Sequence, residues 1–185
     1  EYAEFVYFRL RCSSGCAQQL DPNIMGHLQQ QPPVRNDRLQ QCQAVADTFQ
    51  RDYGVEYESS QIIVNCGGKH SCFNVTYATC EAGDEVIIPA PYWLSYPEMA
   101  KLAGARPVIL DTTDETEFKV TPEQLREAIT PSTKLFILNS PSNPTGSVYS
   151  ADEIKALGDV CVENGVLIMS DDIYEKLLYD GAEFT

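Results

Sequence analysis

The stretch KLFILNSPSNPTGSVYSADEIKALGDVCVENGVLIM, residues 134–169, decides the fold. It begins and ends with short apolar runs, 134–138 and 166–169, that are typical of buried strands. Between them, residues 151–164 have the apolar spacing of an amphipathic helix. A strand, a helix and a second strand in this order predict parallel pairing of the two strands.

The same alternation extends toward the N-terminus. Further strands are predicted at 61–64, 85–88 and 107–110, and helices from about Leu39 to Gly54 and at 68–80, 95–103 and 122–129. The chain is therefore expected to have an α/β fold, an open and mostly parallel sheet with helices on both faces. No repeat or long linker interrupts this regular part, whereas residues 1–33 show no regular pattern.

The composition limits the classes of function. With 43% hydrophobic and 22% charged residues the chain resembles soluble globular proteins. A net charge of −14 argues against nucleic-acid binding, because phosphate backbones attract basic surfaces. No apolar run approaches the roughly 18 residues of a membrane span. No basic-then-apolar signal pattern opens the sequence.

Seven cysteines make an odd count. Cys12 and Cys16 form a lone pair without partners at zinc-ligand spacing, so no metal site is expected. Free cysteine in apolar helices and strands behaves as a small hydrophobe, and this is predicted for Cys66, Cys72, Cys80 and Cys161. Reduced thiols indicate a reducing compartment and a cytoplasmic location.

A Gly-Gly turn follows the expected strand at 61–64. Residues 66–70 read Cys-Gly-Gly-Lys-His and lead into the predicted helix. Small residues let the backbone approach an anion, and the N–H groups of a first helical turn bind phosphate. An ordinary turn is the alternative, and no nucleotide-binding pattern of the G-x-G-x-x-G or Walker A type is present.

The only tryptophan of the chain follows the strand at 85–88. It lies in Pro89-Ala90-Pro91-Tyr92-Trp93, just past the strand end. Because ligands of open α/β sheets bind at the carboxyl ends of strands, the ring of Trp93 is placed to stack on a flat ligand. A role in packing the next helix onto the sheet explains its position equally well.

Two prolines and a glycine follow the strand at 134–138. The segment 139–146 reads Asn-Ser-Pro-Ser-Asn-Pro-Thr-Gly. These residues restrict the backbone, so they would present the Asn143 amide in a fixed direction. An ordinary turn does not need this density of restricted residues, which favours a functional role.

A carboxylate ends the last predicted strand, in Ser170-Asp171-Asp172-Ile173-Tyr174-Glu175. Burying a carboxylate is costly unless it meets a cation or hydrogen-bond donors. A protonated ring nitrogen would be one such cation. The alternative is that Asp171 caps a following helix.

Together the four motifs resemble bacterial aspartate aminotransferases. Their order and spacing are similar to the large domain of fold-type I pyridoxal-phosphate enzymes. The resemblance runs through residues 44–185, which would be a partial cofactor-binding large domain, and leaves 1–43 as a poorly matching N-terminal segment. There, Gln31-Pro32-Pro33-Val34 stands where the family has Tyr-Thr-Pro-Val.

The resemblance implies pyridoxal 5′-phosphate as cofactor. Gly67, Gly68 and Lys69 would hold its phosphate, largely through backbone N–H groups at the helix start. Trp93 would stack on the pyridine ring and border the amino-acid substrate. These four residues would form the phosphate end and one wall of the site.

The resemblance also assigns the polar atoms of the ring. Asn143, beside the substrate, and Tyr174 would both donate to the ring hydroxyl oxygen. Asp171 would pair with the protonated ring nitrogen, which makes the ring a stronger acceptor of electrons. Asp171 and Tyr174 are therefore the catalytic residues expected within this chain.

The activity implied for the intact parent protein is transamination from L-aspartate to 2-oxoglutarate, giving oxaloacetate and L-glutamate. Its partners would be a small amino acid and a 2-oxo acid, in a homodimer with sites at the subunit boundary. An aromatic or alanine aminotransferase, or a C–S lyase acting by β-elimination, is the alternative within the same fold.

The family holds its cofactor on a Schiff-base lysine that follows the Asp–Tyr motif. The six lysines of this chain lie in other motifs: Lys69, Lys101, Lys119, Lys134, Lys155 and Lys176. The arginine that binds the substrate carboxylate is also unmatched. We therefore expect the chain to be a partial one that is catalytically silent by itself.

Overall fold

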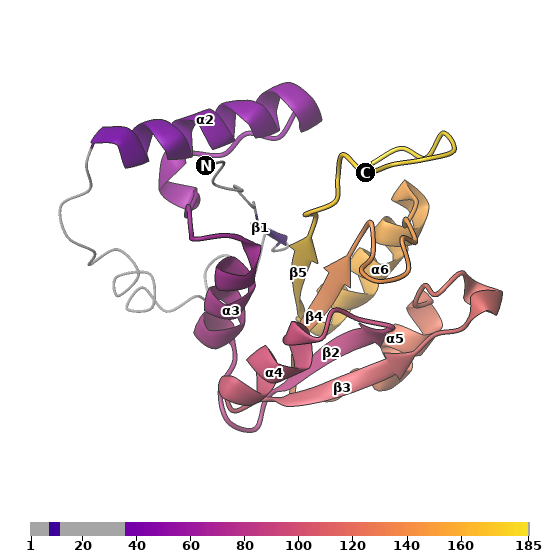
Figure 1. Ribbon diagram of the computed structural model, residues 1–185. Helices are drawn as coiled ribbons and strands as arrows, with labels where there is room; N and C mark the ends of the chain where they lie inside the picture. The colour runs from indigo at the N-terminus through magenta and orange to yellow at the C-terminus, as the bar shows by residue number, and fades with distance from the viewer. Residues whose placement is uncertain (1–7, 12–35, 185) are drawn as a thin grey trace.

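The computed structural model describes residues 8–11 and 36–184 (Figure 1). Within them the sheet has five strands: β1 Phe8–Arg11, β2 Glu85–Ala90, β3 Arg106–Asp111, β4 Thr133–Asn139 and β5 Leu167–Asp171. Their order is β1-β5-β4-β2-β3. Strands β2 to β5 pair in parallel, and β1 joins β5 antiparallel at one edge. The predicted α/β class with a mostly parallel sheet is confirmed.

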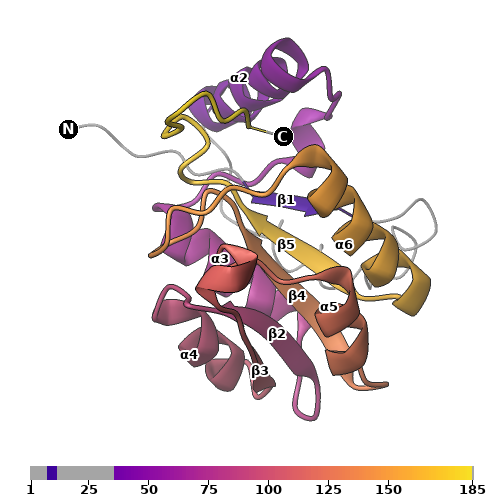
Figure 2. The same ribbon diagram turned by 90° about the vertical axis from the view of Figure 1, so that its right-hand side faces the viewer.

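Helices cover both faces of this sheet. The bounds are α2 Asn36–Tyr53, α3 Gly68–Thr79, α4 Ser95–Leu102, α5 Pro122–Ala128 and α6 Ala151–Asn164, with short 3₁₀ turns at Ser59–Gln61 and Asp114–Thr116. In Figure 1, α3 and α4 lie on one side of the strands and α5 and α6 on the other. The turned view in Figure 2 places α5 and α6 in front of the sheet. None of the helices in the described residues is both long and apolar enough to cross a membrane.

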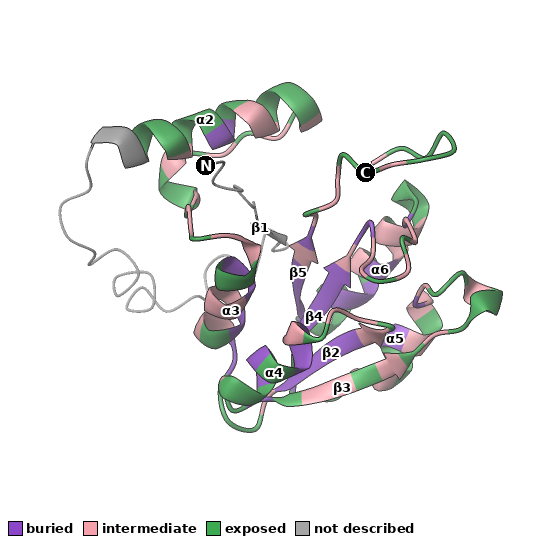
Figure 3. Cartoon of the chain, viewed as in Figure 1, coloured by how far each residue is buried: buried purple, intermediate pink, exposed green. Residues whose placement is uncertain are grey.

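The alternation of side chains along each strand builds two separate cores. In β4, Leu135 and Ile137 join the core under α3 and α4, while Phe136 and Leu138 join the core under α5 and α6. Strands β2 and β5 alternate in the same way, as period-2 geometry requires. Figure 3 shows these central strands as mostly buried. Being covered on both faces explains why they read as continuous apolar runs.

Local signals set the helix ends. At the start of α6 the Ser150 side chain accepts from the Glu153 N–H, and the Glu153 carboxylate accepts from the Ser150 N–H, which is a capping box. Gly165 ends α6 with a positive φ of 69°, a conformation that favours glycine. Helix α6 therefore has the bounds predicted from its sequence, and β5 follows it directly.

The strand predicted at 61–64 is wrong. Residues 62–64 form no strand, and the side chain of Ile63 is 52% exposed. The run lies between a 3₁₀ turn and α3, and no strand of the described sheet pairs with it. A short apolar run has no periodicity that would separate a paired strand from an unpaired extended segment.

Two further differences concern β1 and the cysteines. Strand β1 lies within 1–33, where no element was predicted, and Cys12 and Cys16 lie outside the described residues. Cys72, Cys80 and Cys161 are buried as predicted, but Cys66 is exposed. The prediction for Cys66 fails because the preceding run is not a buried strand, so this residue begins an open turn.

Candidate active site

The carboxyl ends of the parallel strands define the candidate site. From β2 the chain runs to β3 on one side, and it returns to place β4 on the other side of β2. Such a reversal of strand order opens a crevice beyond the carboxyl ends of the two strands, where open α/β sheets bind ligands. The four sequence motifs follow β2, β4 and β5 or begin α3, which contacts β4 and β5.

Asp171, the last residue of β5, is only 5% exposed. Its Oδ2 atom accepts a hydrogen bond of 2.6 Å from the Tyr96 hydroxyl of α4. The Cys72 thiol of α3 lies 3.6 Å from the same oxygen, and Oδ1 accepts from the Ile173 N–H at 3.3 Å. Among the described residues no lysine, arginine or histidine forms an ion pair with Asp171. A turn rather than a helix follows it, so helix capping does not explain this carboxylate.

The donors around Asp171 stay protonated. Burial, together with the charge of Asp171, raises the pKa of the Tyr96 hydroxyl far above its ordinary value. The same two causes raise the pKa of the Cys72 thiol. Both groups therefore remain neutral donors at neutral pH. A carboxylate has about four lone-pair sites, so these contacts leave acceptor capacity for a ligand cation.

The Gly67 turn presents the start of α3. Gly67 is the N-cap with φ 84° and ψ 167°, a conformation that side chains rarely adopt. The Asn65 side chain before the turn donates to the Ser71 hydroxyl at 2.9 Å and accepts from the Asn74 amide at 3.1 Å. These bonds fix the turn, so that the first N–H groups of α3 form a ready site for an anion.

Lys69 links this turn to Trp93. Its Nζ atom lies 5.0 Å from the centroid of the Trp93 ring, within cation–π distance. The Trp93 ring also meets Tyr96 edge to face, with 5.3 Å between centroids and an interplanar angle of 86°. Trp93 also packs against the core under α3 and α4. Part of the Trp93 surface therefore packs the following helix onto the sheet, as the alternative reading of the sequence expected. Trp93 also borders both Lys69 and the Tyr96–Asp171 pair.

Asn143 and Tyr174 come together from two different loops. The Asn143 side-chain amide lies 3.5 Å from the Tyr174 hydroxyl oxygen. The loop carrying Asn143 is closed by the Gly146 N–H donating to the Ser142 carbonyl at 2.8 Å. Both polar groups therefore point to one region beyond the ends of β4 and β5.

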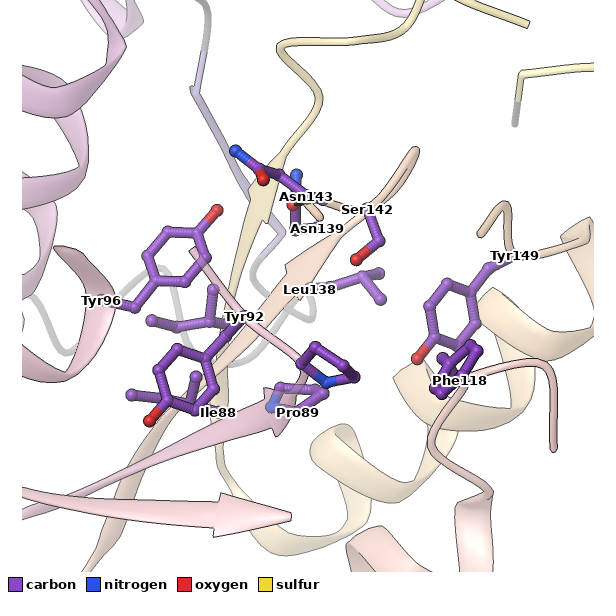
Figure 4. Close-up of a pocket in the computed structure, with 12 residues that line it drawn as sticks. Ile88, Pro89, Tyr92, Tyr96, Phe118, Leu138, Asn139, Ser142, Asn143 and Tyr149 are labelled. Atoms are coloured by element: carbon purple, nitrogen blue, oxygen red, sulfur yellow. Dashed lines mark hydrogen bonds between the residues drawn. The ribbon is translucent and has the colours of Figure 1, made fainter. Parts of the chain in front are cut away.

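A hollow of about 370 Å³, including its open mouth, lies between the ends of β2 and β4 (Figure 4). Tyr92 and Tyr96 border it on one side and Phe118 and Tyr149 on the other. It reaches Asn143, but the Gly67 turn and Asp171 are not among its lining residues. The hollow is therefore one part of the candidate site rather than the whole of it.

Comparisons with known proteins identify the family of this chain. Residues 27–185 match the family model of aminotransferase class I and II. The chain belongs to this family. The aspartate aminotransferase of Geobacillus stearothermophilus is 56% identical over 135 residues, which cover 73% of this chain and 34% of that protein. The aspartate/prephenate aminotransferase of Nitrosomonas europaea is 50% identical over 143 residues, covering 77% and 36% respectively.

The fold of the aminotransferase family is matched as well. The crystal structure of the aspartate aminotransferase from Rhizobium meliloti has a TM-score of 0.78 at 36% identity, covering 94% of this chain and 43% of that chain. This chain spans about a third of the length of the curated relatives it matches. The residues of this chain therefore form only a part of the aminotransferase fold.

Sequence reasoning assigned no role in this site to three residues: Tyr96, Cys72 and Asn139. Tyr96 lies three residues after Trp93, a spacing that puts both on one face of a helical turn. Asn139 is the last residue of an apolar strand, where a polar side chain is a usable signal. Cys72 had no such signal, because its contact with Asp171 depends on how α3 packs on β5.

Proposed function

We propose that the protein containing this chain is a pyridoxal-phosphate-dependent aminotransferase. Its reaction is the exchange of an amino group between L-aspartate and 2-oxoglutarate, giving oxaloacetate and L-glutamate. The buried Asp171 carboxylate carries this proposal, because it has neutral donors but no ion-pair partner among the described residues. A buried carboxylate of this kind is stabilised when a cation completes its shell, and a protonated ring nitrogen is such a cation.

The other residues fit the same ligand. The first turn of α3, with Lys69 beside it, suits a phosphate, and the exposed part of the Trp93 ring suits a stacked heterocycle. Asn143 and Tyr174, which lie 3.5 Å apart, suit a shared ring oxygen. Pyridoxal phosphate, when bound, supplies a ring that takes up the negative charge left when an amino acid loses its α-proton.

Each residue then has a defined task. Asp171 would hold the proton on the ring nitrogen, and Tyr96 would keep the carboxylate oriented. Asn143 and Tyr174 would donate to the ring oxygen and set its basicity. Gly67, Gly68 and Lys69 would bind the phosphate, which fixes the position of the ring against Trp93.

The choice of L-aspartate follows the relatives, whose names include aspartate. Prephenate, named for the relative from Nitrosomonas europaea, is a second candidate acceptor. Aromatic or alanine transamination and β-elimination by a C–S lyase are the other reactions to be separated. We further propose a cytoplasmic homodimer for the intact protein, as the resemblance implies.

The chain offers a direct assay of cofactor binding because Trp93 is its only tryptophan. Pyridoxal phosphate titrated into the chain is expected to quench the fluorescence of Trp93 with saturation, and Asp171→Ala is expected to weaken this binding. The activity is tested in the protein produced from the whole reading frame that contains this chain. L-aspartate, L-alanine and L-phenylalanine are paired with 2-oxoglutarate, and prephenate is tried as acceptor. Absence both of quenching and of amino-group exchange would refute the proposal.

The chain of 185 residues is proposed to be inactive alone. Lys69 borders the candidate site, but it lies against Trp93 at the phosphate end. Borohydride reduction of the chain mixed with pyridoxal phosphate, followed by peptide mass spectrometry, is expected to label no lysine selectively. Stoichiometric labelling of one lysine would contradict this expectation.

A further inference from the structure

Strands β4 and β5 separate at the site, and one side chain spans the point where they part. Asn139 and Asp171 are the last residues of the two strands and are register partners in the parallel pair. Beyond them the chain turns away in both strands, and the two loops that follow carry Asn143 and Tyr174. Backbone pairing therefore ends at Asn139 and Asp171, four residues before Asn143 and three residues before Tyr174.

The Asn139 amide bonds at once to the end of β5 and to the loop that follows β4. Its Nδ2 atom donates to the Asp171 carbonyl oxygen at 2.8 Å. Its Oδ1 atom accepts from the Asn143 N–H at 2.7 Å. Reversing the amide would place donor against donor and acceptor against acceptor, so only one orientation satisfies both contacts.

We propose that Asn139 is a positioning residue of the cofactor site. A planar amide holds its two partners at a fixed separation, so it fixes the Asn143 backbone relative to Asp171. The Asn143 side chain then lies 3.5 Å from the Tyr174 hydroxyl. Through one side chain, the group assigned to the ring nitrogen and the two groups assigned to the ring oxygen are held in one arrangement. This inference rests on the proposed function and gives a role to Asn139, which the sequence motif at 139–146 contained without one.

Two substitutions at Asn139 test its two hydrogen bonds separately. Asn139→Asp keeps an oxygen that accepts from the Asn143 N–H but loses the donor to the Asp171 carbonyl. Asn139→Ala loses both bonds. Asn164→Ala is the matched control, because the Asn164 amide also donates to a backbone carbonyl, that of Val160 at 2.8 Å, but at the end of α6. Thermal unfolding of the three variants shows whether each is folded.

The first measurement is amide hydrogen exchange in the chain without cofactor, followed residue by residue by NMR. Asn139→Ala is expected to speed exchange at the Asn143 N–H by about tenfold or more, the effect of losing one partly buried hydrogen bond. Asn139→Asp and Asn164→Ala are expected to leave that exchange rate close to that of the unsubstituted chain. Unchanged protection of Asn143 in Asn139→Ala would overturn the inference.

The second measurement uses pyridoxal phosphate itself. By quenching of Trp93, Asn139→Ala is expected to bind it about tenfold more weakly. The pH at which the absorbance of the bound cofactor changes is expected to shift as well, because Asn143 no longer donates to the ring oxygen in a fixed direction. Asn139→Asp is expected to produce both effects to a smaller extent than Asn139→Ala, and Asn164→Ala is expected to produce neither. Equal effects of Asn139→Ala and Asn164→Ala would reduce the role of Asn139 to stability and overturn the inference. If the unsubstituted chain binds no cofactor and the whole protein exchanges no amino groups, the proposed function fails, and the exchange experiment alone decides whether Asn139 holds Asn143.

Discussion

The hydrogen bond between Tyr96 and Asp171 is expected to contribute strongly to the stability of the fold. Tyr96 is 2% exposed and Asp171 5% exposed, and the hydroxyl donates to Oδ2 over 2.6 Å. Tyr96→Phe keeps the ring that packs edge to face on Trp93 and removes only the donor. The substitution therefore leaves a buried carboxylate with the Cys72 thiol, a weak donor, at that oxygen.

The expected cost follows from the kind of bond that is lost. A hydrogen bond to a charged group contributes about 1.5–3 kcal/mol, roughly twice a neutral one. We expect the free energy of unfolding to fall by about 2 kcal/mol for Tyr96→Phe. With an m-value of about 2 kcal/mol per molar urea, the midpoint of unfolding falls by about 1 M.

A double-mutant cycle isolates this bond. Asp171→Leu leaves the buried Tyr96 hydroxyl without its acceptor, which costs about 1–3 kcal/mol. When both groups are replaced, neither buried polar atom lacks a partner, so the combined loss is expected to be smaller than the sum by about 2 kcal/mol. Urea unfolding followed by the fluorescence of Trp93 measures all four proteins.

Tyr92→Phe is the matched control. Tyr92 is half-buried, and among the described residues its hydroxyl makes no hydrogen bond, so its free energy of unfolding is expected to change by less than about 0.5 kcal/mol. Additive effects of Tyr96→Phe and Asp171→Leu, or equal effects of Tyr92→Phe and Tyr96→Phe, would refute the reasoning. Either result would show that the hydroxyl and the carboxylate are not coupled in the folded chain.

Three further predictions concern the Gly67 turn and the dependence of the free energy of unfolding on pH. Gly67→Ala forces a side chain into φ 84° and is expected to cost about 1–2 kcal/mol and to weaken pyridoxal phosphate binding, measured by urea unfolding and by Trp93 quenching. Hydrogen bonds from Thr130 and Arg106 lower the pKa of Glu85, so its contribution to stability is present above the ordinary glutamate pKa and is lost as pH falls below it. Glu85→Gln is therefore expected to flatten the loss of stability in urea unfolding between about pH 5 and 3. Burial raises the pKa of the Cys161 thiol to about 12. The contribution of this thiol to the free energy of unfolding is therefore complete below the ordinary thiol pKa, and it is lost as pH rises from there toward 12. Cys161→Ala is expected to reduce the slope of stability above about pH 9 by up to about 1.4 kcal/mol per pH unit, and an unchanged slope would contradict this.

The sequence by itself determined the alternation of elements and most of their bounds. Apolar runs in β2, β4 and β5 indicated strands covered on both faces, and the two cores confirm that reading. The capping box of Ser150 and Glu153 and the glycine at 165 set both ends of α6. These features are local, because each depends on residues within a few positions along the chain.

Pattern reasoning failed where pairing with a distant strand decides the outcome. The apolar run at 61–64 has the composition of a strand, yet it stays unpaired in the described sheet. Strand β1, in a segment without a regular pattern, pairs with β5 from more than 150 residues away. Whether a run becomes a strand depends on a neighbour that supplies hydrogen bonds, and local composition does not record that neighbour.

The residues of the candidate site also fall into two groups, those that the sequence indicated and those that only the structure showed. Gly67, Trp93, Asn143 and Asp171 could be found in the sequence because each is an unusual residue at a strand end or helix start. Only the tertiary structure showed that Tyr96 holds the Asp171 carboxylate and that Asn139 joins the end of β5 to the loop beyond β4. Those contacts depend on how α4 packs on the sheet and on the register of two strands. A buried polar group has to be satisfied by whichever partner the packing brings within hydrogen-bond distance, and the identity of that partner is fixed only when the chain has folded.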